Sequence, residues 1–283
     1  MLRRGAVALA ALMAMATAAA PPVAAEAPVE GAEIVSERTF GHGAMVVRAT
    51  FPEGSGFVSN IFFYNREDVP WEGNEWFEYD WELKGRNPDG GWSQLRVRKA
   101  PNKGLRDVPD EVETKRSIAE RTLHYILIRH EHTYVYDIRW GFNPATYDHT
   151  NPKAHRGNTR SLIVGGARVV NTDTDPRIGN IPLGKKLDFN LGITAFDNAW
   201  AGYLAPGPVD EVFKVDYARF YDTTRKGKRI TLANEPEWRE EFNARNADLP
   251  GWRKGFWPTG ATVFRPDNVK VRDGWLHLEL DRP

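Results

Sequence analysis

The sequence contains no cysteine, carries no net charge and lacks a sustained helical repeat of apolar residues. Without cysteine no disulfide can hold the fold together, so its stability must come from burial of a core. Lysine and arginine together number 38, as do aspartate and glutamate. No long-range field therefore favours nucleic acid or an anionic membrane, and we expect neither as a partner. The basic run Arg225–Arg229 is interpreted as a solvated loop.

Long apolar stretches are absent beyond the N-terminus. Arg3 and Arg4 precede an alanine-rich apolar run that ends in Pro21-Pro22-Val23-Ala24-Ala25, which is the order of a secretory signal. The run is too short to span a bilayer comfortably. We expect residues 1–25 to be a signal peptide cleaved near Ala25, residues 26–30 to be a short linker, and the mature protein to be secreted or periplasmic.

Aromatic residues are abundant, at 12% of the 283 residues, and ten of them are Trp. Aromatic side chains pack cores, but their faces also stack on sugar rings, so this content suits a carbohydrate cleft. The chain is long enough for one large all-β domain or two small ones. Many short segments with alternating polarity lie between turn signals, and this pattern favours an all-β fold.

Between residues 74 and 83 acidic residues alternate with aromatic ones. A strand with this alternation carries Glu78, Asp80 and Glu82 on one face and apolar residues on the other. An ordinary surface strand could share the pattern, but here three carboxylates crowd together with no cation before Lys84. Like charges held close can raise the pKa of one carboxyl group. Hydrolysis of a bond between sugars needs one ionised and one protonated carboxyl at the same pH.

The run Glu78-Tyr79-Asp80-Trp81-Glu82 fits the Glu-x-Asp-x-Glu motif of glycoside hydrolase family 16, and Trp76 also resembles that family's pattern. Segments over 55–64, 132–138 and 198–202 resemble further parts of the family. Those over 238–243, 252–257 and 267–280 resemble the segments with which most members begin. The order is therefore rotated, as in some circularly permuted bacterial 1,3-1,4-β-glucanases. We expect a single permuted domain over 31–283, with 222–233 as the joint between the former termini.

The resemblance implies an all-β fold, a β-jelly-roll sandwich of two antiparallel sheets with a concave substrate cleft. Residues 99–120 and 141–160 are predicted to be long loops because prolines, glycines and asparagines interrupt them. The Gly165-Gly166 pair predicts a hairpin over 162–170.

The resemblance also implies a retaining mechanism, with Glu78 as nucleophile, Glu82 as acid/base and Asp80 hydrogen-bonded to the nucleophile. Retaining chemistry needs the two working carboxyls about 5–5.5 Å apart. Positions i and i+4 of a flat strand separate their Cα atoms by about 13 Å, so the strand must be concave. No cofactor is required; a structural Ca²⁺ is common in the family, but no acidic loop marks a site here.

The cleft positions of the family correspond to six residues of this sequence: Phe62, Tyr64, Trp76, Asn190, Trp200 and Trp257. Asp188 and Gly192 stand where the mixed-linkage enzymes have Arg and Trp, and Leu95 stands about where they have Asn. We expect these changes to remove a cation, a stacking platform and a polar contact from the cleft, with a gap left at Gly192. We expect a monomeric endo-β-glycanase that hydrolyses a 1,3-1,4- or 1,3-linked β-glucan. A depolymerase of an acidic or substituted exopolysaccharide, a transglycosylase and a non-catalytic carbohydrate-binding jelly roll remain alternatives.

Overall fold

The computed structural model describes residues 28–65, 75–98, 106–151, 160–174, 181–196, 198–243, 248–259 and 261–282. The predicted signal peptide lies outside them. Among the described residues, no helix has the length and apolarity needed to cross a membrane. Regular structure in the described ranges is almost entirely β, and two short 3₁₀ turns are described there, η2 (Pro144–Thr146) and η4 (Pro266–Asn268). The prediction of an all-β fold is confirmed.

The sheet that carries the acidic strand is called the front sheet. Its neighbouring strands are antiparallel throughout. In spatial order they are β15 (Trp252–Lys254), β1 (Val29–Phe40), β10 (Leu187–Ala195), β3 (Phe57–Tyr64), β4 (Trp76–Lys84), β5 (Gly90–Arg98) and β6 (Arg106–Glu113). The acidic strand β4 therefore lies inside the sheet, with a partner on each side.

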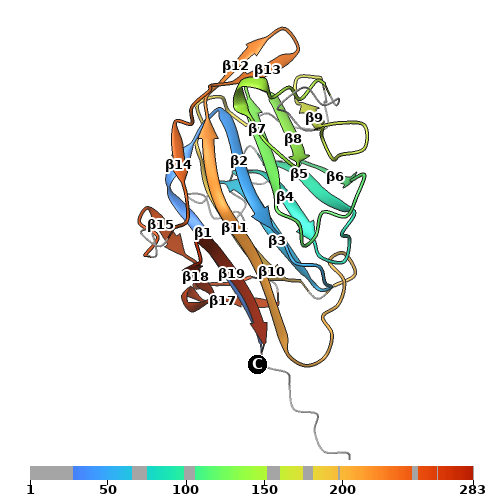
Figure 1. Cartoon of the computed structure of the whole chain (residues 1–283), viewed down its shortest axis with the longest axis vertical. Coiled ribbons are helices and arrows are strands. Elements are labelled where there is room, and N and C mark those ends of the chain that lie inside the picture. The colour runs from blue at the N-terminus through green and yellow to red at the C-terminus, as the bar shows by residue number, and fades with distance from the viewer. Residues whose placement is uncertain are drawn as a thin grey trace, which may run out of the picture.

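The second sheet, called the back sheet, packs against the front sheet (Figure 1). It runs in the order β9 (Arg168–Asn171), β8 (Thr133–Arg139), β7 (Leu123–His130), β2 (Gly43–Thr50) and β11 (Val209–Tyr221). The far side of β11 pairs with β14 (Trp238–Glu240) and β19 (Trp275–Arg282), and β19 pairs with β18 (Val269–Arg272). The predicted jelly-roll sandwich of two antiparallel sheets is confirmed.

Strand β1 belongs to both sheets. Its first residues pair with β19 and, in parallel, with β17 (Thr262–Phe264), which is joined to β16 (Pro258–Thr259). The rest of β1 pairs with β10 and β15. Because β1 begins at Val29, residues 29 and 30 are part of the domain, and the predicted linker over 26–30 is too long at its C-terminal end.

The core lies between the two sheets and is rich in aromatic rings. Phe63 stacks on Tyr79 with ring centroids 4.7 Å apart, and Trp81 of the front sheet meets Tyr136 of the back sheet edge-on at 5.6 Å. Tyr79 and Trp81 are at most 1% exposed. Their alternation with the acidic residues follows from the two-residue period of a strand, so burial of one face leaves the carboxylates on the other.

Two predictions about loops are wrong. Residues 106–113 form strand β6, which among the described strands pairs only with β5; Pro109 is tolerated because an edge strand has unpaired positions where no N–H is needed. The predicted hairpin over 162–170 does not form either. Residues 168–171 pair with β8, whereas Ile163 bridges to Thr114.

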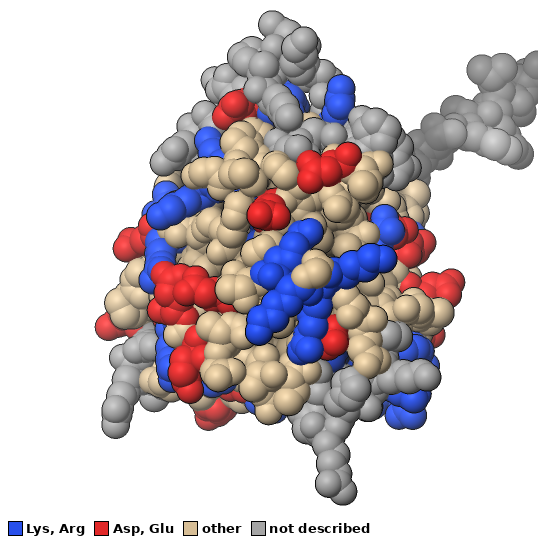
Figure 2. All heavy atoms as spheres, turned by 90° about the horizontal axis from the view of Figure 1, so that it is seen from above, with Lys and Arg blue, Asp and Glu red and all other residues tan. Residues whose placement is uncertain are grey.

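The C-terminal segment is integral to the sandwich, because β15, β17 and β19 all pair with β1 or β11. The circular permutation itself stays a prediction. The predicted joint contains a separate hairpin of β12 (Thr223–Lys226) and β13 (Arg229–Leu232). It projects from the end of the molecule opposite to the C-terminus (Figure 1), and a group of Lys and Arg side chains lies on that end (Figure 2).

Candidate active site

The three acidic residues of β4 lie in one column on the outer face of the front sheet. Strand register places a residue of β3 and a residue of β5 directly beside each carboxylate. The three rows are Tyr64–Glu78–Arg96, Phe62–Asp80–Gln94 and Asn60–Glu82–Trp92. Residues directly opposite each other in antiparallel strands lie close enough to interact. The predicted cleft residues Phe62 and Tyr64 therefore flank the column.

Glu78 is held by a hydrogen bond and a cation. The indole Nε1 of Trp76 donates to Glu78 Oε2 over 2.6 Å, and Arg96 Nη1 lies 3.6 Å from the same oxygen. The Glu78 side chain is only 12% exposed, so water screens these interactions weakly. Both interactions stabilise an ionised carboxylate, which is the form a nucleophile needs.

Trp76 is itself fixed by charged neighbours. The guanidinium groups of Arg96 and Arg98 lie 5.7 and 5.5 Å from its ring centroid, and the Tyr64 ring meets it edge-on at 6.2 Å. Such cation–π contacts hold the indole in place. The sequence predicted Trp76 as a sugar contact, and the structure gives it a further role as hydrogen-bond donor to Glu78.

Asp80 lies between the two glutamates and is 1% exposed. Gln94, directly opposite on β5, accepts a 2.7 Å hydrogen bond at its backbone oxygen from the Tyr136 hydroxyl. Burial raises the pKa of Tyr136 well above its usual value, and the charge of Asp80 adds to the shift. Tyr136 therefore stays protonated and ties β8 to β5 at the level of Asp80.

The surroundings of Glu82 differ from those of Glu78. Trp92 stands opposite Glu82, and Lys84, two residues further along β4, lies 4.9 Å from the Trp92 ring and 5.4 Å from the Trp200 ring. The Lys84 side chain is 3% exposed and pairs with Glu111 at 3.2 Å. Trp92 and Trp200 meet edge-on at 6.0 Å. The predicted cleft residue Trp200 is therefore brought to this end of the column.

Trp92 and Lys84 were missed as site residues by sequence reasoning. The sequence did contain information that could have identified Trp92. The turn over 87–91 predicts that the next strand pairs with β4 in antiparallel orientation, and residues at equal distances before and after the turn then lie opposite each other, as Glu82 and Trp92 do. The two-residue period of the strand places Lys84 on the same face as Glu82. The burial of Lys84 between two rings could not be predicted, because one of the rings belongs to Trp200, which is distant in the chain.

The other two predicted cleft residues are Asn190 of β10 and Trp257, which follows β15. Asn190 lies in the row of Phe62 and Asp80 but is fully buried, and its amide donates to the Asp188 backbone oxygen at 3.1 Å. Trp257 follows β15 and packs against Phe256 and Phe264. Strands β1, β10 and β3 lie between β15 and the acidic strand β4.

The three departures from the mixed-linkage pattern have different outcomes. Leu95 is fully buried in the core, so the expected loss of a polar cleft contact there is wrong: Gln94 and Arg96 face outward instead. Arg253 of β15 places Nη2 3.8 Å from Asp188 Oδ2, so a cation lies beside that position after all.

Gly192 faces Glu33 of β1. A Cβ atom added at Gly192 would lie 3.3 Å from the Ala32 backbone oxygen and 3.4 Å from the Glu33 Cγ. The Glu33 side chain therefore occupies part of the gap that was expected beside Gly192.

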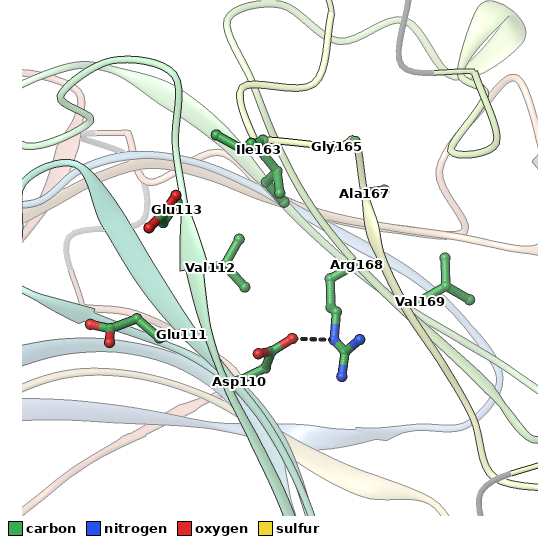
Figure 3. Close-up of a pocket in the computed structure, with 11 residues that line it drawn as sticks. Asp110, Glu111, Val112, Glu113, Ile163, Gly165, Ala167, Arg168 and Val169 are labelled. Carbon is green, nitrogen blue, oxygen red and sulfur yellow. Dashed lines mark ion pairs between the residues drawn. The ribbon is translucent and has the colours of Figure 1, made fainter.

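A separate hollow of about 440 Å³ opens between β6 and residues 163–169 (Figure 3). There Asp110 of β6 pairs with Arg168 of β9 at 2.6 Å, across the edges of the two sheets. The residues that line this hollow do not include Glu78, Asp80 or Glu82. Among the described residues no cluster of three or more His, Cys, Asp or Glu could hold a metal ion. The structural Ca²⁺ stays a prediction.

No protein-family model matches the chain. A β-glucanase of Fibrobacter succinogenes is 24% identical over 258 residues, which cover 89% of this chain and 64% of that protein. This relative confirms the resemblance to glycoside hydrolase family 16. The chain thus spans about two thirds of the length of its curated relative.

Two solved structures are similar to part of the chain. The Bacillus licheniformis β-glucanase is 14% identical, with a TM-score of 0.42, over 71% of this chain and 70% of the other. The laminarinase catalytic domain of Thermotoga maritima MSB8 is 13% identical, with a TM-score of 0.46, over 69% and 78%. The fold itself rests on the strand pairing described above.

Proposed function

We propose that the protein is a retaining endo-β-glycanase that hydrolyses a 1,3-1,4- or 1,3-linked β-glucan. The observation that carries the proposal is the column of Glu78, Asp80 and Glu82 on an outer sheet face, with Trp76 and Arg96 placed where both favour a negative charge on Glu78. The sequence likeness to a β-glucanase supports it.

In the proposed first step a carboxylate oxygen of Glu78 attacks the anomeric carbon while Glu82 protonates the departing glycosidic oxygen. The product is a covalent glycosyl-enzyme. In the second step Glu82 accepts a proton from water, the water oxygen attacks the anomeric carbon, and Glu78 leaves as a carboxylate. The Trp76 hydrogen bond and the Arg96 cation stabilise Glu78 as that leaving group, because both favour its negative charge.

Aromatic residues at both ends of the column support cleavage within a chain. Tyr64 and Trp76 lie at the Glu78 end, and Trp92 and Trp200 lie at the Glu82 end. Aromatic faces stack on sugar rings, so sugar units on both sides of the scissile bond have a surface to bind. An endo-acting enzyme needs such contacts on both sides.

The test is reducing-sugar release from mixed-linkage β-glucan and laminarin, with the products sized and their anomeric configuration followed by NMR. Glu78→Gln and Glu82→Gln should each lower turnover by roughly 10²–10⁴-fold. The exposed Glu37 of β1 offers a matched control, and Glu37→Gln should leave turnover unchanged. A Glu78 or Glu82 variant that keeps more than about a tenth of the wild-type rate would exclude that residue from the proposed chemistry.

The same products distinguish hydrolysis from transglycosylation. A transglycosylase would form longer oligosaccharides at high acceptor concentration, whereas a hydrolase forms short products with reducing ends. We also propose that residues 1–25 direct export. Sequencing the N-terminus of the mature protein tests this, and a mature chain that retains Met1 would contradict it.

A further inference from the structure

The β12–β13 hairpin concentrates positive charge in a chain without net charge. Four of the five residues in Arg225–Arg229 are Lys or Arg. The turn centres on Gly227, whose φ of 62° lies in the left-handed region that glycine adopts readily. The prediction of a solvated loop over this run is wrong, because its basic residues lie on two paired strands and the turn between them.

The hairpin is fixed to the outer face of the back sheet. Ile230 is 1% exposed and Leu232 is 8% exposed, and both pack into a small apolar cluster with Val46, Ile128 and Val135. In β2, β7 and β8 these residues alternate with those that face the main core, so the cluster lies on the opposite face of the back sheet. The acidic column lies on the outer face of the front sheet. The hairpin and the candidate active site therefore lie on opposite sides of the sandwich.

The two arginines anchor the hairpin. Arg225 Nη2 donates to Thr133 Oγ1 at 2.6 Å, and Arg229 Nη2 donates to the Tyr147 backbone oxygen at 2.8 Å. Their charges also have acidic neighbours, since Arg225 lies 3.9 Å from a Glu131 oxygen and Arg229 lies 3.5 Å from an Asp148 oxygen. These contacts hold both strands of the hairpin against the back sheet.

The two lysines at the turn have no such partners in the described part of the chain. Lys226 and Lys228 are exposed, and no described carboxylate lies within 4.0 Å of either amine. Seen from this end of the molecule, Lys and Arg side chains form a group with scattered acidic side chains around it (Figure 2). The hairpin thus presents two cations on a rigid support.

We propose that the tip of the β12–β13 hairpin, Lys226 and Lys228, is a docking site for an anionic polysaccharide. The exposed residues at the tip, 224–228, include no apolar side chain that could enter a bilayer. They also include no aromatic ring that could stack on a neutral sugar or a base. The side chains at the tip can therefore bind an anion through their positive charge, but they offer no apolar or aromatic contact. Because the hairpin lies on the side away from Glu78 and Glu82, a docked chain would leave the candidate active site open.

The choice of a polysaccharide over a lipid or a nucleic acid rests on the proposed function. A glycanase docked on an acidic glycan is held in the matrix where its own substrate lies, which raises the effective concentration of that substrate. The attraction is electrostatic and lies at the surface, so salt should weaken it.

The test measures binding of the full chain to alginate, a polyuronate, by affinity electrophoresis and calorimetry at low ionic strength. Lys226→Gln combined with Lys228→Gln should weaken binding by about tenfold, because it removes both unpaired cations from the surface field. Wild-type binding should itself fall steeply as the ionic strength rises to about 0.15 M. Thermal unfolding should be unchanged, since both side chains are exposed.

Lys214→Gln combined with Arg116→Gln is the matched control, because it removes two exposed positive charges, one from β11 and one from the segment between β6 and β7, that also have no described carboxylate within 4.0 Å. The proposal fails if the wild-type chain does not bind alginate at low salt, if the control pair weakens binding equally, or if phosphatidylglycerol vesicles or duplex DNA bind at the hairpin and alginate does not. Alginate binding is measured without glycan hydrolysis. A protein that binds alginate but cleaves no β-glucan would therefore refute the proposed function and leave the docking site standing.

Discussion

Replacing Trp76 with Phe tests whether the hydrogen bond to Glu78 supports catalysis. The change removes the Nε1–H that donates to Glu78 Oε2 over 2.6 Å but keeps an aromatic ring between Tyr64 and Arg96. Hydrogen bonds to charged groups contribute about 1.5–3 kcal/mol. Because the Glu78 side chain is 12% exposed, solvent replaces the lost donor poorly. At about 1.36 kcal/mol per tenfold, the expected loss in kcat/KM is about 10- to 150-fold.

The loss should appear mainly in kcat, since the lost donor acts on the nucleophile and the remaining ring can still contact the sugar. Initial rates on the best β-glucan of the panel give both constants. Trp275→Phe is the matched control: it makes the same substitution in a ring that also lies beside an arginine, Arg48 at 5.6 Å, but on β19 of the back sheet, away from the acidic column. It should change kcat by less than about threefold, within the range of a surface substitution.

A double-mutant cycle decides between a role on Glu78 and a general effect on the sheet. In the Glu78→Gln background the acceptor is no longer an anion, so Trp76→Phe should cost much less than in the wild-type background. If Trp76→Phe keeps kcat/KM within twofold of wild type, or costs the same in both backgrounds, the hydrogen bond does not support the nucleophile.

Further predictions concern stability and specificity. Burial, with a contribution from Arg48, lowers the pKa of His124 from 6.5 to about 4, so the folded state takes up its proton later than the unfolded state as pH falls. The free energy of unfolding should therefore drop by about 2 kcal/mol between pH 8 and pH 5 through this group, and His124→Gln should flatten that slope in urea titrations. Deletion of residues 234–283 should abolish cooperative melting, because β15, β17 and β19 pair with β1 and β11; a soluble, active remnant would show the tail to be dispensable. Gly192→Trp alone should not improve binding of mixed-linkage β-glucan, because the Glu33 side chain crowds the site. The double variant with Glu33→Ala should bind that glucan more tightly. Equal affinities of the single and double variants would place Gly192 outside the cleft.

The sequence by itself determined which residues of the acidic strand share a face. Side chains alternate along any strand, so Glu78, Asp80 and Glu82 had to be on the face opposite to Tyr79 and Trp81 once one face was buried. The turn after Lys84 also determined that β5 would pair with β4. These are short-range rules, and they were enough to predict the all-β fold class and the carboxylate column.

Only the tertiary structure decided what surrounds that column. Arg253 reaches Asp188 because β15 pairs with β1, and Glu33 narrows the space at Gly192 because β1 pairs with β10. Trp200 lies beside Lys84 although more than a hundred residues separate them. Register between distant strands depends on how the whole core packs, and no local pattern encodes it. The surroundings of Asp188, Gly192 and Lys84 therefore come from the assembled sandwich, whereas Trp76 and Arg96, which contact Glu78, lie on the same strand and on its hairpin partner β5.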